Sequence, residues 1–171
     1  MKNSRQTLVK LCATALFMAL TVVTSSFSIP VPGGHLYIND VVICVAAILL
    51  EPLYAAAAGG IGAFLGDFFF YPTPMFVSLV THGVQALVIS LLVRKLKLKH
   101  EWIAASVAVA VGAVIMIAGY SFGRAYIYAT PEIALVKLPY QILQAAVGAV
   151  AGVVLCYPLG LVKARDKLLG E

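Results

Sequence analysis

Polar side chains recur at helical spacing inside two apolar segments of this sequence. In the later segment, Lys137, Gln141 and Gln144 stand at positions i, i+4 and i+7, and Tyr140 is next to Gln141. Residues at this spacing share one face of a helix. An ammonium group and two amides facing lipid would be costly, so this face should point into a helix bundle. It suits hydrogen bonding to a small ligand, although a lysine reaching the membrane surface and amides that join helices would also explain it.

The second polar face lies in the segment 75–93. Ser78, His82 and Gln85 again stand at i, i+4 and i+7, with His82 about two helical turns from the segment's start. A lone buried histidine is more often satisfied by its neighbours than used to bind a ligand. Because His82 has polar neighbours on its own face, ligand binding is an equally good interpretation.

A polar stretch between the first two apolar segments supplies four further candidates. The dipeptide Gly33-Gly34 precedes them and would allow this stretch to move. Ordinary solvated loop polarity would explain these residues, whereas the functional hypothesis is a lid over an outward-facing pocket. The four residues are His35, Tyr37, Asn39 and Asp40.

Two charged residues stand at the ends of apolar segments. Asp67 follows a run in which Ala58, Gly62 and Gly66 recur every fourth residue, a spacing that lets helices approach closely in a membrane. An acid among apolar spans is a candidate functional residue. Arg124 follows a later apolar segment, and it could pair with Asp67 near the outer surface.

The composition indicates that these segments lie in a lipid membrane. Of the 171 residues, 62% are hydrophobic and 11% are charged, whereas soluble domains carry about 25% charged residues. This excludes a water-soluble globular protein. At about 20 apolar residues per membrane-spanning helix, the chain has room for five or six spans and for no soluble domain.

We therefore predict an all-α integral membrane bundle of six transmembrane helices in one domain. The second span is short, and it is either re-entrant or a full crossing; we favour the crossing because the basic clusters then share one side. The first span could mimic a secretory signal, but we interpret it as a retained helix. The predicted spans are about 7–27, 38–50, 53–70, 75–93, 102–123 and 133–162.

The distribution of positive charge sets the predicted orientation. Ten of the twelve Lys and Arg residues fall in three clusters, at the N-terminus, between residues 94 and 99, and at the C-terminus. This pattern follows the positive-inside rule, so both termini should be cytoplasmic. It does not resemble a basic nucleic-acid-binding face, and we expect no nucleic-acid partner.

The sequence lacks the motifs of a metal site and of an ATPase. Cys12, Cys44 and Cys156 are far apart and show no metal-ligand spacing, so we interpret them as buried structural thiols and expect no metal or cofactor. No glycine-rich phosphate loop followed by Lys and Ser or Thr is present. The chain should therefore not hydrolyse ATP itself, and we do not expect an enzyme.

The sequence resembles the substrate-binding S components of energy-coupling factor (ECF) vitamin transporters over nearly its whole length. The resemblance rests on six short spans in under 200 residues, on the segment Ala15-Leu16-Phe17-Met18-Ala19, and on the block from Gly33 to Asp67 that ends in GGIGAFLGD. This block is most similar to the branch associated with riboflavin, hydroxymethylpyrimidine or pyridoxine.

The resemblance implies a transport subunit of a bacterial plasma membrane. Such a subunit binds a vitamin at its outer side beneath the first loop, and it docks on a transmembrane coupling protein that two cytoplasmic ATPases drive. Ala15 and Ala19 match the docking motif of the family. Family pockets draw on the first loop and on spans four to six, which overlaps the polar faces found above.

The polar side chains suit a small hydroxylated pyridine or pyrimidine, so we expect pyridoxine or hydroxymethylpyrimidine as the ligand. Riboflavin or another vitamin is the alternative. A small membrane enzyme is a rival interpretation, but no recognised spacing joins its candidate residues Asp40, Asp67 and His35. A structural assembly subunit would explain Ala15 and Ala19 but not the polar faces.

Overall fold

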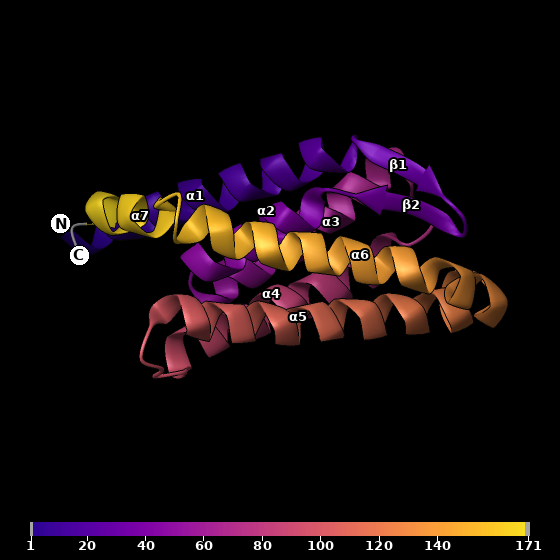
Figure 1. Cartoon of the computed structure of the whole chain (residues 1–171). Coiled ribbons are helices and arrows are strands. Elements are labelled where there is room, and N and C mark those ends of the chain that lie inside the picture. Colours follow the sequence, from indigo (N-terminus) through magenta and orange to yellow (C-terminus); the bar gives the residue numbers. More distant parts are fainter. Residues whose placement is uncertain (1, 170–171) are drawn as a thin grey trace.

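Helices dominate the computed structural model, which describes residues 2–169 of the chain. They lie side by side in one elongated bundle, with a short antiparallel hairpin between the first two helices (Figure 1). Its elements are α1 (Lys2–Ser25), β1 (Ser28–Val31), β2 (Gly34–Tyr37), α2 (Asn39–Leu49), α3 (Pro52–Phe70), α4 (Met75–Lys95), α5 (Glu101–Gly123), the π-helix η1 (Arg124–Tyr128), α6 (Pro131–Cys156) and α7 (Leu161–Leu169).

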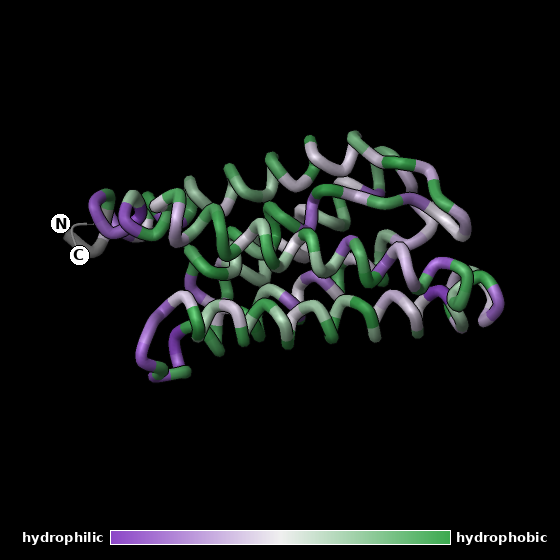
Figure 2. The backbone as a smooth tube through the Cα atoms, viewed as in Figure 1, coloured by the Kyte–Doolittle hydropathy of each residue, from purple (hydrophilic) through white to green (hydrophobic). Residues whose placement is uncertain are grey.

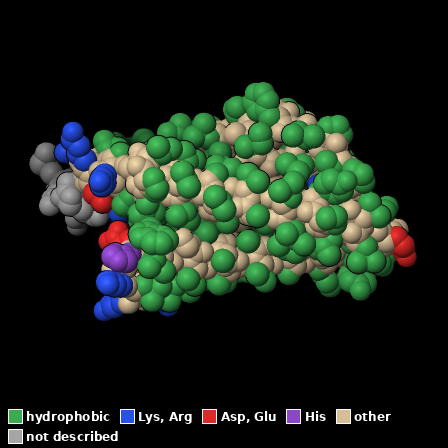
Figure 3. Space-filling model, in the orientation of Figure 1, with side chains coloured by type: hydrophobic (Ala, Val, Ile, Leu, Met, Phe, Trp, Pro, Cys, Tyr) green, Lys and Arg blue, Asp and Glu red, His purple; other side chains and the backbone are tan. Residues whose placement is uncertain are grey.

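Five helices of the described chain are long and apolar enough to cross a membrane. They comprise residues 4–25, 52–70, 75–95, 101–128 and 131–156. On the face shown in Figure 3, hydrophobic side chains cover the length of the bundle and charged side chains gather at its ends. In Figure 2, long hydrophobic stretches of the backbone tube likewise run along the bundle. Because apolar side chains face the lipid along most of this length, the predicted all-α membrane bundle is confirmed.

Helix α2 forms the centre of the bundle rather than its surface. It contacts α1, α3, α4 and α6, and residues such as Ile43 and Ala47 are fully buried. Its 11 residues rise only about 16 Å, roughly half of the hydrocarbon core. The predicted full crossing at 38–50 therefore remains a prediction, since α2 covers only half of the depth by itself.

The two ends of the bundle differ in what they hold. Both termini and the connection between α4 and α5 lie at one end, which we call the terminal end; the hairpin and η1 lie at the other, the hairpin end (Figure 1). At the terminal end, Lys10 Nζ pairs with Glu51 Oε1 at 2.5 Å. The predicted cytoplasmic location of the termini remains a prediction, since it requires a membrane orientation.

The segment expected to be an external loop folds as a β-hairpin. Strands β1 and β2 pair Ser28 with Tyr37 and Val31 with Gly34. Pro32 and Gly33 make the turn, and Gly33 takes a φ of 80°. Proline fixes the first central residue of such a turn and glycine permits the positive φ of the second, so the residues that break the helix also build the hairpin.

The predicted sixth span, 133–162, is wrong at its C-terminal end. Helix α6 ends at Cys156, and a separate helix, α7, begins at Leu161. The break contains Pro158 and Gly160, and Gly160 has a φ of 81°. A proline removes a helical hydrogen bond and a glycine with positive φ ends a helix, so the chain stops and restarts here.

Small residues set the distances between helices. The predicted seam on α3 packs against α1: a Cβ added at Gly66 would lie 2.8 Å from the Cβ of Ser25. On α6, a Cβ added at Gly148 would lie 2.7 Å from the Cβ of Asp40. Both values are below normal contact distance, so only glycine lets α1 approach α3 and α2 approach α6 this closely.

One face of α1 has no helix of the described chain packed against it. Ala15 and Ala19 are exposed on α1, and so is Cys12. The interpretation of the three cysteines as buried thiols is therefore correct for Cys44 and Cys156 but wrong for Cys12. Cys12 is exposed because α1 packs against α2 and α3 with its opposite side only.

Candidate functional site

Most of the predicted site residues lie inside the bundle. Ten of the thirteen are buried, and the remaining three, His35, Tyr37 and Tyr140, are half-buried. The polar faces of α4 and α6 therefore point inward and not toward lipid. The buried ten are Asn39, Asp40, Asp67, Ser78, His82, Gln85, Arg124, Lys137, Gln141 and Gln144.

The Gln144 amide links the hairpin to α2. Its Oε1 accepts a hydrogen bond of 3.0 Å from the backbone N–H of Tyr37, and its Nε2 donates one of 2.5 Å to Oδ2 of Asp40. The close approach of α2 to α6 at Gly148, one helical turn away, makes this contact possible. Both ends of one side chain are thus engaged, which holds the Asp40 carboxylate in one orientation.

His82 lies next to the same carboxylate. Its Nδ1 is 2.7 Å from Oε1 of Gln85 and 3.8 Å from Oδ1 of Asp40. Because an amide oxygen only accepts, Nδ1 carries the proton and donates it to Gln85. The His82 ring packs edge-on against Tyr120, with centroids 5.2 Å apart.

The second buried acid, Asp67, belongs to a hydroxyl network. The Ser78 hydroxyl donates to Oδ2 of Asp67, and it also contacts the hydroxyl of Tyr120 at 2.5 Å. Helices α3, α4 and α5 each contribute one member. The sequence analysis considered a pairing of Asp67 with Arg124, but the described residues show no ion pair between them, and Arg124 donates to Gln141 instead.

The two cations of the hairpin end have their own partners. Arg124 donates to Oε1 of Gln141 at 2.8 Å and lies over the ring of Tyr128, 5.5 Å from its centroid. Lys137 donates from Nζ to the backbone oxygen of His35 at 2.6 Å. The first contact joins η1 to α6, and the second fastens the hairpin to α6.

These groups converge on one region. Burial raises the pKa of the Tyr37 phenol, the nearby Asp67 carboxylate raises it further, and Arg124 opposes both. Tyr37 therefore remains a neutral hydroxyl at physiological pH. The hairpin also lies close to the end of α3, because the ring of His35 packs edge-on against Tyr71, the residue after α3, with centroids 4.9 Å apart. We call this region the polar cluster; it comprises His35, Tyr37, Asn39, Asp40, Asp67, Ser78, His82, Gln85, Tyr120, Arg124, Tyr128, Lys137, Gln141 and Gln144.

Unused hydrogen-bonding capacity is concentrated in the polar cluster. Five buried side-chain atoms have no hydrogen-bond partner among residues 2–169. An unpaired buried polar atom costs about 1–3 kcal/mol, so these atoms are the candidate ligand-binding groups of the cluster. The atoms are His35 Nδ1, Tyr37 Oη, Asn39 Oδ1, Asp40 Oδ1 and Tyr128 Oη.

The sequence analysis missed two tyrosines of the cluster. Tyr120 lies within a long apolar run, and Tyr128 lies in a stretch expected to be an external loop. A hydroxyl inside an apolar span is a signal that could have identified Tyr120. The predicted site residue Tyr140 is half-buried, and its neighbour Gln141 makes the contacts on this side of α6.

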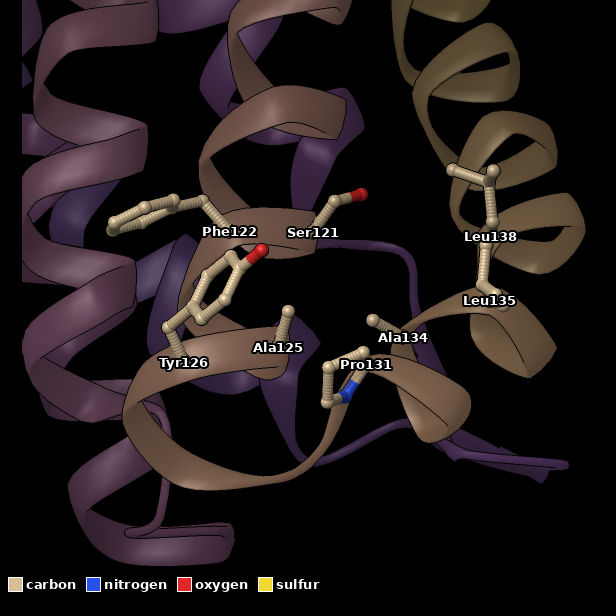
Figure 4. Close-up of a pocket in the computed structure, with 8 residues that line it drawn as sticks. All are labelled: Ser121, Phe122, Ala125, Tyr126, Pro131, Ala134, Leu135 and Leu138. Atoms are coloured by element: carbon tan, nitrogen blue, oxygen red, sulfur yellow. The ribbon is translucent and has the colours of Figure 1, made fainter.

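An apolar pocket of about 330 Å³ lies beside the polar cluster, between α5, η1 and α6 (Figure 4). Phe122, Tyr126 and Leu135 are among its lining residues. Ser121 also lines it, and its hydroxyl accepts a hydrogen bond of 3.4 Å from Nε2 of Gln141 in the cluster. Within the described chain, no group of three His, Cys, Asp or Glu side chains is placed to hold a metal ion.

Comparison with known proteins supports a transport role. The family model described as "ECF-type riboflavin transporter, S component" matches residues 5–161. A protein of Pyrococcus woesei, described as an uncharacterized protein in a gap 3′ region, is 30% identical over 136 residues. That alignment covers 78% of this chain and 89% of the relative.

Proposed function

This chain belongs to the family of ECF-type riboflavin transporter S components and is thereby a vitamin-binding transport subunit. For this subunit we propose that the ligand is a small hydroxylated pyridine or pyrimidine. Pyridoxine and hydroxymethylpyrimidine are the two candidates. The observation that carries this proposal is the group of unpaired buried atoms, which belong to hydroxyl, imidazole, amide and carboxylate groups. These groups suit a compact ring with several polar substituents.

Riboflavin is the second candidate, and the description of the matching family favours it. Its larger ring system would need more space than a single pyrimidine. The apolar pocket beside the cluster could supply it, because Ser121 lines that pocket and also contacts Gln141 of the cluster.

In this proposal the hairpin is the lid of the site. Lys137 donates to the hairpin backbone at His35, and Gln144 accepts from the hairpin backbone at Tyr37. Two side chains of α6 thus hold the hairpin over Asp40. Their release would open the site toward the hairpin end, which we place on the outer side of the membrane because the basic clusters gather at the other end.

The proposed partners are a transmembrane coupling protein and two cytoplasmic ATPases, with the chain spanning a bacterial plasma membrane. Support comes from α1, whose exposed face carries Ala15 and Ala19. Two small residues one turn apart let a helix of another protein approach closely. The coupling protein would then cover a surface that α2 and α3 leave open.

The direct test is titration of the purified protein in detergent, without ATP, by isothermal titration calorimetry. Pyridoxine, hydroxymethylpyrimidine and riboflavin would be compared. We expect submicromolar binding of one of the first two. Submicromolar binding of riboflavin alone would favour the second candidate, and no submicromolar binding of any vitamin by folded protein would contradict the proposal.

A further inference from the structure

We propose that the polar cluster selects a neutral heteroaromatic ligand that donates an N–H hydrogen bond to Oδ1 of Asp40, and that Gln144 positions this carboxylate. The inference rests on the proposed function and narrows its ligand class. It distinguishes rings that carry an amino group or a ring N–H from rings of the same shape that lack one.

Asp40 offers an acceptor that the protein leaves unused. Its side chain is buried, and Oδ2 is engaged by Gln144, but Oδ1 has no hydrogen-bond partner in the described part of the chain. Nδ1 of His82 is 3.8 Å away and is committed to Gln85. An ionised carboxylate only accepts hydrogen bonds, so a ligand that satisfies Oδ1 must donate.

The charges around the cluster favour a neutral donor over a cation. Two carboxylates, Asp40 and Asp67, share the region with two cations, Arg124 and Lys137. The formal charges balance, and a positively charged ligand would add an excess charge to a buried site. An amino group on an aromatic ring, or a ring N–H, donates without carrying charge.

The surroundings of Oδ1 favour a flat ring. This oxygen faces His82, whose ring packs edge-on against Tyr120 at 5.2 Å between centroids. A donor that reaches Oδ1 therefore lies near the His82 ring, and aromatic groups prefer stacked or edge-on contact with such a neighbour.

Gln144 determines which oxygen of Asp40 faces the ligand. Its Oε1 is fixed by the backbone N–H of Tyr37, so its Nε2 is the group that meets Asp40. An amide nitrogen must meet an oxygen. In the variant Asp40→Asn, the amide oxygen would therefore turn toward Gln144, and the new NH₂ group would face the ligand's donor.

The test compares ligands that differ by one donor. Hydroxymethylpyrimidine would be paired with the analogue in which hydrogen replaces the ring amino group, and riboflavin with the analogue methylated at its imide nitrogen. Calorimetry would give the affinity ratio within each pair. We expect wild-type protein to prefer the donor-bearing member of the pair that binds by about 10- to 100-fold, and Asp40→Asn to abolish this preference.

Glu51→Gln is the matched control, because it removes a carboxylate at the terminal end, where Glu51 pairs with Lys10. It should leave both the affinity and the ratio unchanged. Gln144→Met serves as a second variant if Asp40→Asn does not fold. If Gln144 positions Asp40, its loss should lower the affinity ratio within the ligand pair. If Gln144 is only structural, its loss should weaken the binding of both ligands equally and leave the ratio unchanged.

The results separate the two claims. Equal binding of both members of a pair by wild-type protein, or an unchanged ratio in Asp40→Asn, would overturn the inference and leave the proposed function intact. Submicromolar binding of pyridoxine alone would do the same, because neutral pyridoxine carries hydroxyl groups but no N–H. Failure of folded wild-type protein to bind any vitamin would overturn the proposed function, and the inference with it.

Discussion

At the scale of residues, the polar groups of this bundle are satisfied across helices rather than within them. Ser78 of α4 shows this best, because its hydroxyl contacts both Asp67 of α3 and Tyr120 of α5. Ser78 is fully buried. Removing its hydroxyl would leave a carboxylate oxygen and a phenol without this partner in a region of low dielectric.

Ser78→Ala is therefore expected to destabilise the protein by about 1–3 kcal/mol, measured as a lowered thermal unfolding midpoint in detergent. Ser106→Ala is the matched control, since the Ser106 hydroxyl donates to a backbone oxygen of its own helix at an exposed position. It should change the midpoint little. Equal shifts in the two variants would show that the network on Ser78 contributes no stability.

At the scale of elements, the hairpin and α6 form a coupled pair. Gly33 lies at the tip of the hairpin, where an added Cβ would be 3.0 Å from the Cβ of Lys137. The turn therefore packs directly on the helix turn that carries the lysine. A change in the turn should affect how firmly the hairpin covers the polar cluster.

Gly33→Ala is expected to weaken vitamin binding several-fold by accelerating release, which stopped-flow measurement of ligand dissociation would detect. Gly160→Ala is a close control because Gly160 has nearly the same φ, 81° against 80°, but no atom within 4 Å of an added Cβ. Both variants carry the backbone strain, and only the first also crowds α6. Unchanged dissociation in Gly33→Ala would contradict the proposed role of the hairpin.

The sequence predicts the helices well because apolar length and breaking residues are local signals. It locates five long helices and the polar faces of α4 and α6. It does not reveal the hairpin, because strand pairing between Ser28 and Tyr37 depends on the helices that support it. The hydrogen-bond partners of Asp67 and Gln144 also cannot be predicted from the sequence, since these contacts join residues that are distant along the chain.

At the scale of the whole molecule, the two proposed functions belong to two separate parts of the bundle. The polar cluster lies inside the hairpin end, while the exposed face of α1 carries Ala15 and Ala19 on the outside of the bundle. Ligand binding and docking on the coupling protein should therefore be separable by mutation.

Ala15→Trp and Ala19→Trp are expected to abolish vitamin uptake in cells that contain the complete transporter, because an indole would hold the two proteins apart. Binding to the purified subunit should remain unchanged. Val114→Trp, on the exposed side of α5, is the control and should retain uptake. Loss of binding in folded Ala15→Trp, or normal uptake in both alanine variants, would refute the docking role.

The most direct test of the account is a crystal structure of the protein with its vitamin bound. We predict ligand density beneath the hairpin, within hydrogen-bonding distance of Asp40 and close to His82. Density confined to the apolar pocket lined by Phe122 and Leu135 would contradict the assignment of the polar cluster as the binding site.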